Sequence, residues 1–124
     1  MSLSCINNGT VTWITCNETN QCFGDVLQCL SKQDCFVECS AATSCVSAVI
    51  NCPVNHQCTI QCADEYSCYE AAINASSSTD LQVTGNGTYA LDRATIYCPN
   101  DGPYSFNHAQ SCSVEATRSQ FSFT

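Results

Sequence analysis

Hydrophobic and polar residues alternate in short segments that recur along the chain at a fixed spacing. Aligning the segments of the form C-x-[VI]-x-C divides residues 12–103 into four consecutive units of 23 residues. Apolar residues favour unit positions 1, 3 and 5 and again positions 14, 16 and 18, with mostly polar residues between them. A period of two is typical of strands that bury one face. Each unit therefore predicts two main strands, with a third short one near position 11.

Equal positions of successive units form columns of similar residues. Positions 3 and 16 hold the most regular apolar columns, which are Ile14, Val37, Ile60 and Val83, and Leu27, Ile50, Ile73 and Ile96. Asn, Asp, Ser, Gly and Pro lie between the apolar segments and favour tight corners. This organisation predicts an all-β fold, a short parallel β-solenoid (β-helix) of about five rungs that stack about 4.8 Å apart.

The predicted solenoid is a single domain that covers the whole chain. Its complete repeats are 12–34, 35–57, 58–80 and 81–103. Residues 1–11 look like the tail of a preceding unit, so we expect a partial N-terminal rung there. Residues 104–124 are expected to form a degenerate C-terminal rung, in which a constant period places Tyr104 at position 1, Phe106 at position 3 and His108 at position 5.

Cysteine is unusually frequent, with 13 residues in a chain of 124. This density indicates a disulfide-rich protein of an oxidising compartment. Zinc is a poor alternative, because the chain has two histidines and no C-x-x-C pair. We therefore expect a secreted, extracellular or cell-surface protein without metal or cofactor. Because the chain starts without a basic or apolar leader, we expect that a signal segment was removed or that this is a fragment of a longer precursor.

The repeated cysteines fall into four columns, at unit positions 1, 5, 11 and 18. Stacked cysteines of one column would also lie at a distance suitable for a disulfide, so geometry alone leaves the connectivity open. Positions 5 and 11 lose cysteine together, at Gly85 and Leu91. Position 18 and the following position 1 do the same, at Ala75 and Leu81. Joint loss indicates partners, which predicts the disulfides Cys16–Cys22, Cys39–Cys45, Cys62–Cys68, Cys29–Cys35 and Cys52–Cys58.

Three cysteines remain outside this rule. Cys98 stands at position 18, but a constant period places Tyr104 where its partner belongs, so Cys112 is the nearest candidate. Cys5 is then left unpaired. An odd cysteine in a secreted protein indicates an intermolecular bond, a partner in a segment outside this chain, or a free thiol.

The charge and the sequons narrow the possible partners. Eleven acidic residues against three basic ones give a net charge of −8, so we expect no nucleic acid partner. No apolar run approaches the length of about 18 residues that indicates a membrane span. Four N-x-[ST] sequons, which predict N-linked glycans on a secreted protein, occur at Asn8, Asn17, Asn74 and Asn86.

The segments CFVECSAATSCVSAVINCPVNHQC and CTIQCADEYSCYEAAIN make the repeat recognisable. They resemble the C-x-[IV]-x-C-x-x-x-x-S-C-x-x-A-x-I-x-C-P repeats of extracellular proteins from algae, ciliates and oomycetes. The resemblance is specific over residues 35–74 and weaker over 12–34 and 81–103. It implies a disulfide-laced β-helix with a secreted or cell-surface structural role, and it assigns no catalytic residue.

Candidate catalytic residues are few. His56 and His108 are the only histidines, and we interpret His108 as a residue of the capping rung. Parallel β-helices include polysaccharide-cleaving enzymes that use clustered acids with a basic partner, for which Arg93 and Arg118 are the candidates. That analogy rests on the fold alone. We therefore expect that the protein is not an enzyme.

Outward apolar residues suggest where the chain makes contact. Two ladders are expected on outer faces, Trp13 with Phe36 at position 2 and Val26 with Val49 at position 15. Contiguous apolar side chains indicate a contact surface, unless another segment of the chain covers them. The alternation in S-Q-F-S-F-T places Phe121 and Phe123 on one face of a strand that can pair with a neighbouring chain.

Head-to-tail pairing between solenoid ends is heterologous and generates filaments. We therefore expect a structural extracellular glycoprotein that self-associates, as a subunit of a fibril, hair or coat. One alternative is a cell-surface module that binds a carbohydrate or a protein through Trp13 and Phe36. A second alternative is a polysaccharide-cleaving β-helix enzyme that depends on Arg93.

Overall fold

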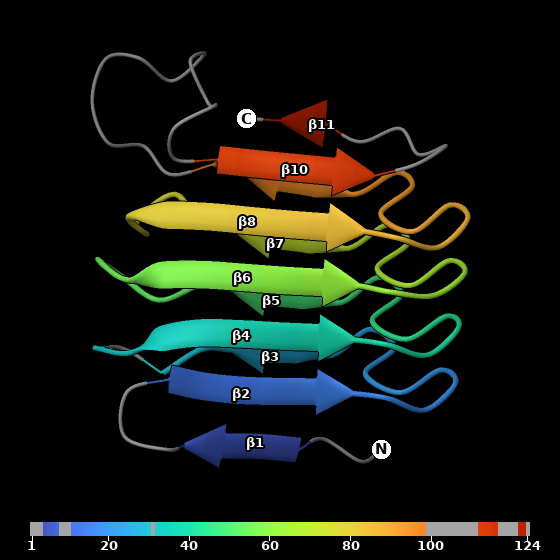
Figure 1. Ribbon diagram of the computed structural model, residues 1–124, viewed down its shortest axis with the longest axis horizontal. Coiled ribbons are helices and arrows are strands. Elements are labelled where there is room, and N and C mark those ends of the chain that lie inside the picture. The colour runs from blue at the N-terminus through green and yellow to red at the C-terminus, as the bar shows by residue number, and fades with distance from the viewer. Residues whose placement is uncertain (1–3, 8–10, 31, 99–111, 117–121, 124) are drawn as a thin grey trace.

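The structure is a computed structural model that describes the backbone of residues 4–7, 11–30, 32–98, 112–116 and 122–123, with side chains for 11–30 and 32–98. Every regular element in these ranges is a β-strand. The predicted all-β solenoid is confirmed, because the chain winds through two sheets whose repeated strands run parallel (Figure 1). No helix in the described ranges could span a membrane.

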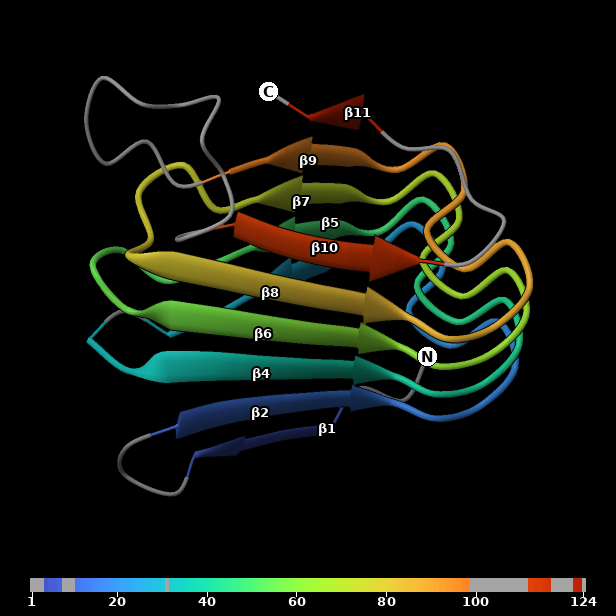
Figure 2. The same ribbon diagram turned by 45° about the horizontal axis from the view of Figure 1, so that its top comes forward.

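The first sheet, here sheet A, has the spatial order β1-β2-β4-β6-β8-β10. Its strands are β1 (Ser4–Asn7), β2 (Val11–Cys16), β4 (Asp34–Cys39), β6 (Gln57–Cys62), β8 (Asp80–Gly85) and β10 (Cys112–Ala116). The second sheet, sheet B, has the order β11-β9-β7-β5-β3. Its strands are β3 (Val26–Gln28), β5 (Val49–Asn51), β7 (Ala72–Asn74), β9 (Thr95–Tyr97) and β11 (Ser122–Phe123). Figure 2 shows the sheets as two layers joined on one side by stacked corners.

Residues 23 apart pair across both sheets through the four repeats. Ile14 pairs with Val37 in sheet A, and Leu27 pairs with Ile50 in sheet B. The predicted columns at positions 3 and 16 are fully buried between the sheets; they are Ile14, Val37, Ile60 and Val83, and Leu27, Ile50, Ile73 and Ile96. Burial of one such side chain contributes about 1.5–3 kcal/mol, so these columns are the main source of stability besides the disulfides.

The corner that leads from sheet A to sheet B has a left-handed backbone at unit positions 9, 11 and 13, where the sequence predicted a short third strand. The residues with positive φ are Asn20, Cys22 and Gly24 in the first rung, Thr43, Cys45 and Ser47 in the second, Tyr66, Cys68 and Glu70 in the third, and Tyr89, Leu91 and Arg93 in the fourth. Several of their N–H groups donate to carbonyls of neighbouring rungs. The Thr43 N–H donates to the Glu65 carbonyl, and the Cys45 N–H donates to the Gln21 carbonyl, both at 3.0 Å. The corners are therefore hydrogen-bonded along the solenoid axis as the sheets are.

Disulfides close both kinds of corner. The five bonds are Cys16–Cys22, Cys39–Cys45, Cys62–Cys68, Cys29–Cys35 and Cys52–Cys58, the same pairs that joint loss predicts. Each joins residues with a sequence separation of 6. In the fourth rung the buried Leu91 fills the place of the position-11 cysteine. An apolar side chain thus substitutes for the bridge in that corner.

The interpretation of residues 1–11 as the tail of a preceding parallel unit is wrong. Strand β1 runs antiparallel to β2, with Ser4 paired to Thr15 and Asn7 paired to Thr12. Only the stretch 8–10 connects the two strands, which is the length of a hairpin loop. Parallel strands need a crossover of about a dozen residues or more. The short connection therefore dictates the direction of β1.

The fifth rung begins later than a constant period predicts. Cys112 pairs with Leu81, so Cys112 and not Tyr104 takes unit position 1. Position 1 is where the partner of each position-18 cysteine stands in the earlier rungs, and Cys98 occupies position 18 of the fourth. Cys98 is itself disulfide-bonded. The corrected register therefore brings Cys112 under the same pairing rule as the other cysteines.

The same shift reassigns two further positions of the last rung. Val114 pairs with Val83 at position 3, and Ala116 takes position 5. These places had been assigned to Phe106 and His108, which lie outside the described residues. Extra residues between two strands add little closure entropy, whereas a slipped register would move apolar residues out of their column. The register of the last rung is therefore set by the type of residue at each unit position and not by a constant spacing of 23 residues.

Candidate functional site

The two sheets end differently at the N-terminal end of the solenoid. In sheet A, β1 lies outside β2 and covers its edge. In sheet B, β3 is the last strand, and no strand among the described residues pairs with its outer edge. An edge strand presents N–H and C=O groups that can pair with another chain. The end of sheet B is therefore the first candidate for a contact site.

Apolar side chains of the first rung are exposed beside this edge. Phe23, Val26 and Leu30 are 59%, 60% and 41% exposed. In the second rung, the residues at the positions of Phe23 and Leu30 are Val46 and Pro53, and both are buried. Phe23 and Leu30 are exposed because no rung lies beneath them in the described structure. A further rung stacked on this end would cover both side chains.

Position 14 of the same rung carries a charged residue. Asp25 stands where the later rungs have Ala48, Ala71 and Ala94, all of which are buried. The Oδ2 atom of Asp25 is buried, and within the described structure it has no hydrogen-bond partner. A buried polar atom without a partner lowers stability. A hydrogen-bond donor brought by a second chain would satisfy this oxygen.

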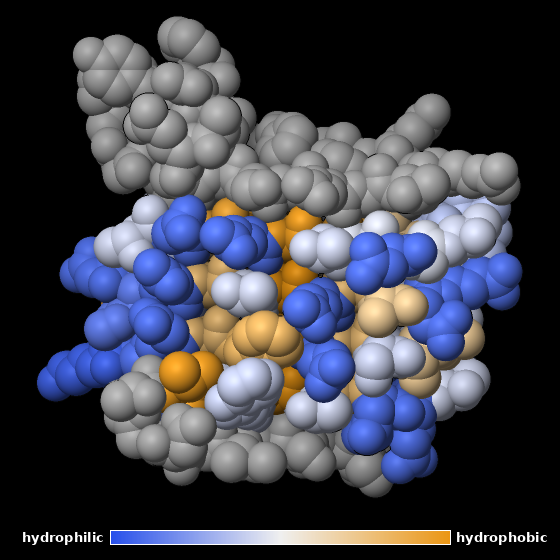
Figure 3. Space-filling view, viewed as in Figure 1, coloured by the Kyte–Doolittle hydropathy of each residue, from blue (hydrophilic) through white to orange (hydrophobic). Residues whose placement is uncertain are grey.

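Trp13 and Phe36 lie side by side on the outer face of sheet A. Their ring centroids are 4.4 Å apart with an interplanar angle of 34°, and both side chains are half-buried. Figure 3 shows this face, where hydrophobic residues lie among hydrophilic ones that gather toward the sides. At position 15 of sheet B, Val26 is exposed and Val49 is half-buried. The two outward ladders are present, and only Val26 among them has most of its surface free.

Several other residues singled out in the sequence can be placed only in part. Phe123 lies in β11 and pairs in register with Ile96 of β9. Cys5 lies in β1, opposite Ile14. The remaining ones lie outside the described residues; they are Asn8, His108, Arg118 and Phe121.

A cluster of tyrosines, here the tyrosine corner, occupies the third and fourth rungs. Tyr66 and Tyr89 share unit position 9 and stack with ring centroids 5.2 Å apart. Tyr69 contacts Tyr66 edge to face at 5.4 Å, and the Arg93 guanidinium lies 5.9 Å from the centre of the Tyr69 ring. Tyr66 and Tyr89 are 37% and 40% exposed, although their φ angles of 57° and 59° disfavour bulky residues. The corner is a second candidate contact site.

The remaining titratable groups have local structural roles. His56 Nδ1 lies 3.4 Å from Asp34 Oδ1, and the same carboxylate oxygen accepts the Gln57 N–H at 3.1 Å. Asp64 and Glu70 are exposed on the corner. Arg93 contacts a tyrosine ring and makes no ion pair with a described residue. Among the described residues, the acid and base that lie within ion-pair distance are Asp34 and His56.

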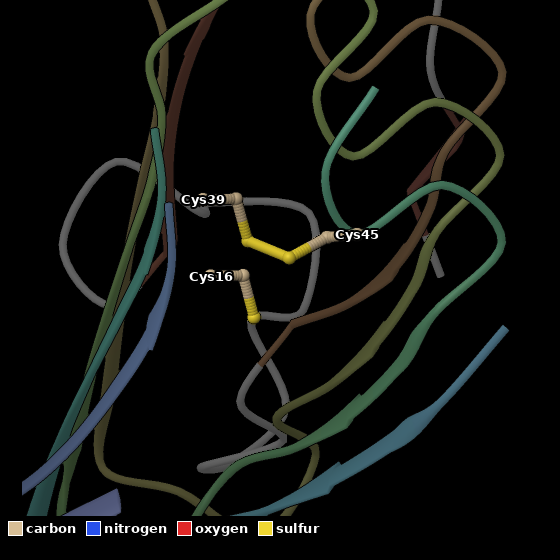
Figure 4. A group of neighbouring side chains, drawn as sticks. All are labelled: Cys16, Cys39 and Cys45. Atoms are coloured by element: carbon tan, nitrogen blue, oxygen red, sulfur yellow. A yellow bond between two sulfur atoms is a disulfide. The ribbon is translucent and has the colours of Figure 1, made fainter. Parts of the chain in front are cut away.

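Three sulfur atoms of neighbouring rungs lie close together, within 4.8 Å of one another (Figure 4). They belong to Cys16, Cys39 and Cys45, which are buried. Cys39 and Cys45 are bonded to each other, and Cys16 is bonded to Cys22. Metal coordination uses thiolates, so sulfurs held in disulfides are not available as ligands. The group is a stack of disulfides.

Three of the four sequons lie in the described part of the chain with exposed asparagines. Asn17 and Asn86 share unit position 6, and Asn74 stands at position 17 of sheet B. Asn74 also lines a pocket of about 320 Å³. Exposure is a requirement for a glycan on the folded protein, and all three asparagines meet it.

Comparisons with protein family models, curated proteins and solved structures give no match. A function must therefore be inferred from the residues and surfaces described above.

Sequence reasoning missed the two strongest surface features. Phe23 and Leu30 lie outside the strands, so the alternation of residues within a strand does not mark them as outward-facing. The tyrosine corner carries a signal in the alignment, since Tyr66 and Tyr89 share a unit position, and so does Asp25, which interrupts a column of alanines. Columns within the corners are thus as informative as columns within the strands.

Proposed function

We propose that this chain is a structural extracellular glycoprotein, a subunit of a fibril, hair or coat in which solenoids associate end to end. The open edge of β3 carries the proposal, because it lies beside the exposed Phe23, Val26 and Leu30. The likeness of the repeats to extracellular algal, ciliate and oomycete repeats and the five disulfides support the same setting. No catalytic activity is part of the proposal.

The joint is confined to sheet B at the N-terminal end. Strand β1 already occupies the edge of sheet A there, whereas β3 has a free edge among the described strands. At the other end of sheet B, β11 runs parallel to β9. A β11 strand of one chain placed beside β3 of the next continues sheet B across the junction. Such a contact joins two different surfaces, so it repeats into a filament.

Light scattering of the oxidised, glycosylated protein over a range of concentrations tests the proposal. We expect the mean mass to rise with concentration for the native chain. Val26→Lys places a charge on the open edge and should keep the protein monomeric. Val54→Lys is the matched control, because Val54 is similarly exposed at 53% but lies away from the edge. A native protein that stays monomeric at high concentration, with no fibres in electron micrographs, would contradict the proposal.

A second candidate function is a cell-surface recognition module, and the tyrosine corner favours it. Exposed tyrosines beside an arginine are typical of residues that carry binding energy. Trp13 and Phe36, first considered for this role, are half-buried against each other. Capture of oligosaccharides on a glycan array distinguishes the two sites. Loss of capture in Tyr89→Leu but not in Trp13→Ala would assign recognition to the corner, and no capture by the native protein would exclude it.

A further inference from the structure

A pocket beside Asn74 includes this sequon in its lining. It has a volume of about 320 Å³ and is lined by Gln28, Asn51, Val54, Asn74 and Ser76, among others. Pockets for small ligands start at about 300 Å³, so its size suits one monosaccharide unit. The residues come from three successive rungs, which places the pocket along the outer side of sheet B.

The side chains of the pocket supply the groups that a sugar requires. Asn51 Nδ2 donates to Gln28 Oε1 at 3.0 Å, which orients the two amides along the sheet. Their remaining donors and acceptors can bond hydroxyl and acetamido groups. Val54 adds an exposed apolar surface that a sugar ring can cover. Neither amide side chain is charged, so the pocket suits a neutral sugar.

The acceptor asparagine is oriented by its own sequon. The Ser76 hydroxyl donates to Asn74 Oδ1 at 3.1 Å, and the Ser76 N–H lies 3.4 Å from the same oxygen. These contacts engage the carbonyl oxygen of the Asn74 amide and leave its Nδ2 atom, the atom that carries an N-linked glycan, outside them. Asn17 and Asn86 are exposed on the opposite corner, and neither lines this pocket.

We propose that the first N-acetylhexosamine of a glycan on Asn74 docks in this pocket, against Gln28, Asn51 and Val54. A sugar tethered at the rim has a high effective concentration, so weak contacts suffice to hold it. The glycan at this site then lies along sheet B, whereas those on Asn17 and Asn86 extend into solvent. The inference rests on the glycosylated state that is part of the proposed function.

Enzymatic removal of glycans from the native protein tests the inference. The protein is secreted from eukaryotic cells, treated with peptide-N-glycosidase without denaturation, and followed by peptide mass spectrometry at each sequon. The enzyme can reach a docked sugar only during the fraction of time in which it is undocked. We expect Asn74 to lose its glycan about tenfold more slowly than Asn17 and Asn86. After reduction and unfolding, the three rates should become equal.

Variants of the pocket distinguish a docked sugar from slow glycan release at Asn74 that has another steric cause. Val54→Ser should accelerate release at Asn74 and leave the rates at Asn17 and Asn86 unchanged. Gln82→Ser also introduces a serine at an exposed position, in sheet A and outside the pocket, and should alter none of the three rates. Equal native rates at all sites, or glycans on Asn17 and Asn86 but none on Asn74, would overturn the inference. Absence of glycans from all three would instead contradict the glycoprotein proposal itself.

Discussion

Gly87 approaches Asp64 of the neighbouring rung so closely that a Cβ atom on Gly87 would lie 2.3 Å from the backbone carbonyl carbon of Asp64. The obstacle is backbone and cannot move aside as a side chain would. Gly87→Ala should therefore destabilise the fold by about 3 kcal/mol, at the upper end of the usual cost of overpacking. The substitution keeps the sequon at Asn86, so glycosylation can be held constant during denaturant unfolding.

Gly24 provides the matched comparison for that prediction. Nothing lies within 4 Å of a Cβ atom there, but its φ angle is 66°. Gly24→Ala should cost only about 1 kcal/mol, because the sole penalty is the left-handed backbone. Equal losses of stability for the two variants would show that the close approach of Gly87 does not exist in solution.

Asp25→Ala should stabilise the monomer. The change restores the alanine found at this position in the next three rungs and removes the buried Oδ2 atom that lacks a partner. We expect a gain of about 1 kcal/mol in guanidinium denaturation at neutral pH. The exposed Glu65→Ala is the control and should have little effect. A loss of stability in Asp25→Ala would indicate that this carboxylate has a partner within the chain.

Cys98 is predicted to be bonded to Cys112. The register of β10 places Cys112 at unit position 1, where the partners of Cys29 and Cys52 stand. Proteolysis without reduction followed by mass spectrometry should yield one peptide pair that contains both cysteines. Thiol titration in denaturant should then report whether Cys5 is free. A pair that joins Cys5 to Cys98 would disprove the prediction.

Removal of Cys22 alone should scramble the neighbouring disulfide. Cys16 would keep a thiol whose sulfur lies within 4.8 Å of both sulfurs of Cys39–Cys45. A thiolate at that distance can attack the disulfide and exchange partners. Cys22→Ala should therefore yield mixed Cys16–Cys39 and Cys16–Cys45 species in peptide maps. The double variant Cys16→Ala/Cys22→Ala lacks the attacking thiol and should retain Cys39–Cys45 intact.

The strands and disulfides of the solenoid followed from the sequence because both repeat. A column such as Leu27, Ile50 and Ile73 combines evidence from several rungs, and joint loss at Gly85 and Leu91 separates one pairing scheme from another. The last rung was misplaced because extra residues between Cys98 and Cys112 shift the 23-residue spacing. They leave the alternation of apolar and polar residues in place. Alternation around Phe106 looked equivalent to alternation around Val114.

The corners and the ends were harder to predict for physical reasons. Positions with a left-handed backbone are usually glycine or asparagine, as at Asn20 and Gly24. Tyr66 and Tyr89 adopt the same left-handed conformation, which their residue type does not predict. At Tyr66 a hydrogen bond to the neighbouring rung holds this conformation, since its N–H donates to the Thr88 carbonyl. The exposure of Phe23 depends on the absence of a rung beneath it. No local pattern carries that information.

The five resolved disulfides have a mechanical consequence. Each one joins residues six apart along the chain, and none joins two strands stacked in one sheet. Because the backbone and the bridges Cys29–Cys35 and Cys52–Cys58 link successive rungs only at the corners, tension along the axis is carried between stacked strands by hydrogen bonds and side-chain packing. When these yield, a rung can peel away from an end while its covalent loops stay closed, which shortens the length of chain that it releases. The molecule should extend in small, recoverable steps and act as a spring with a limited stroke.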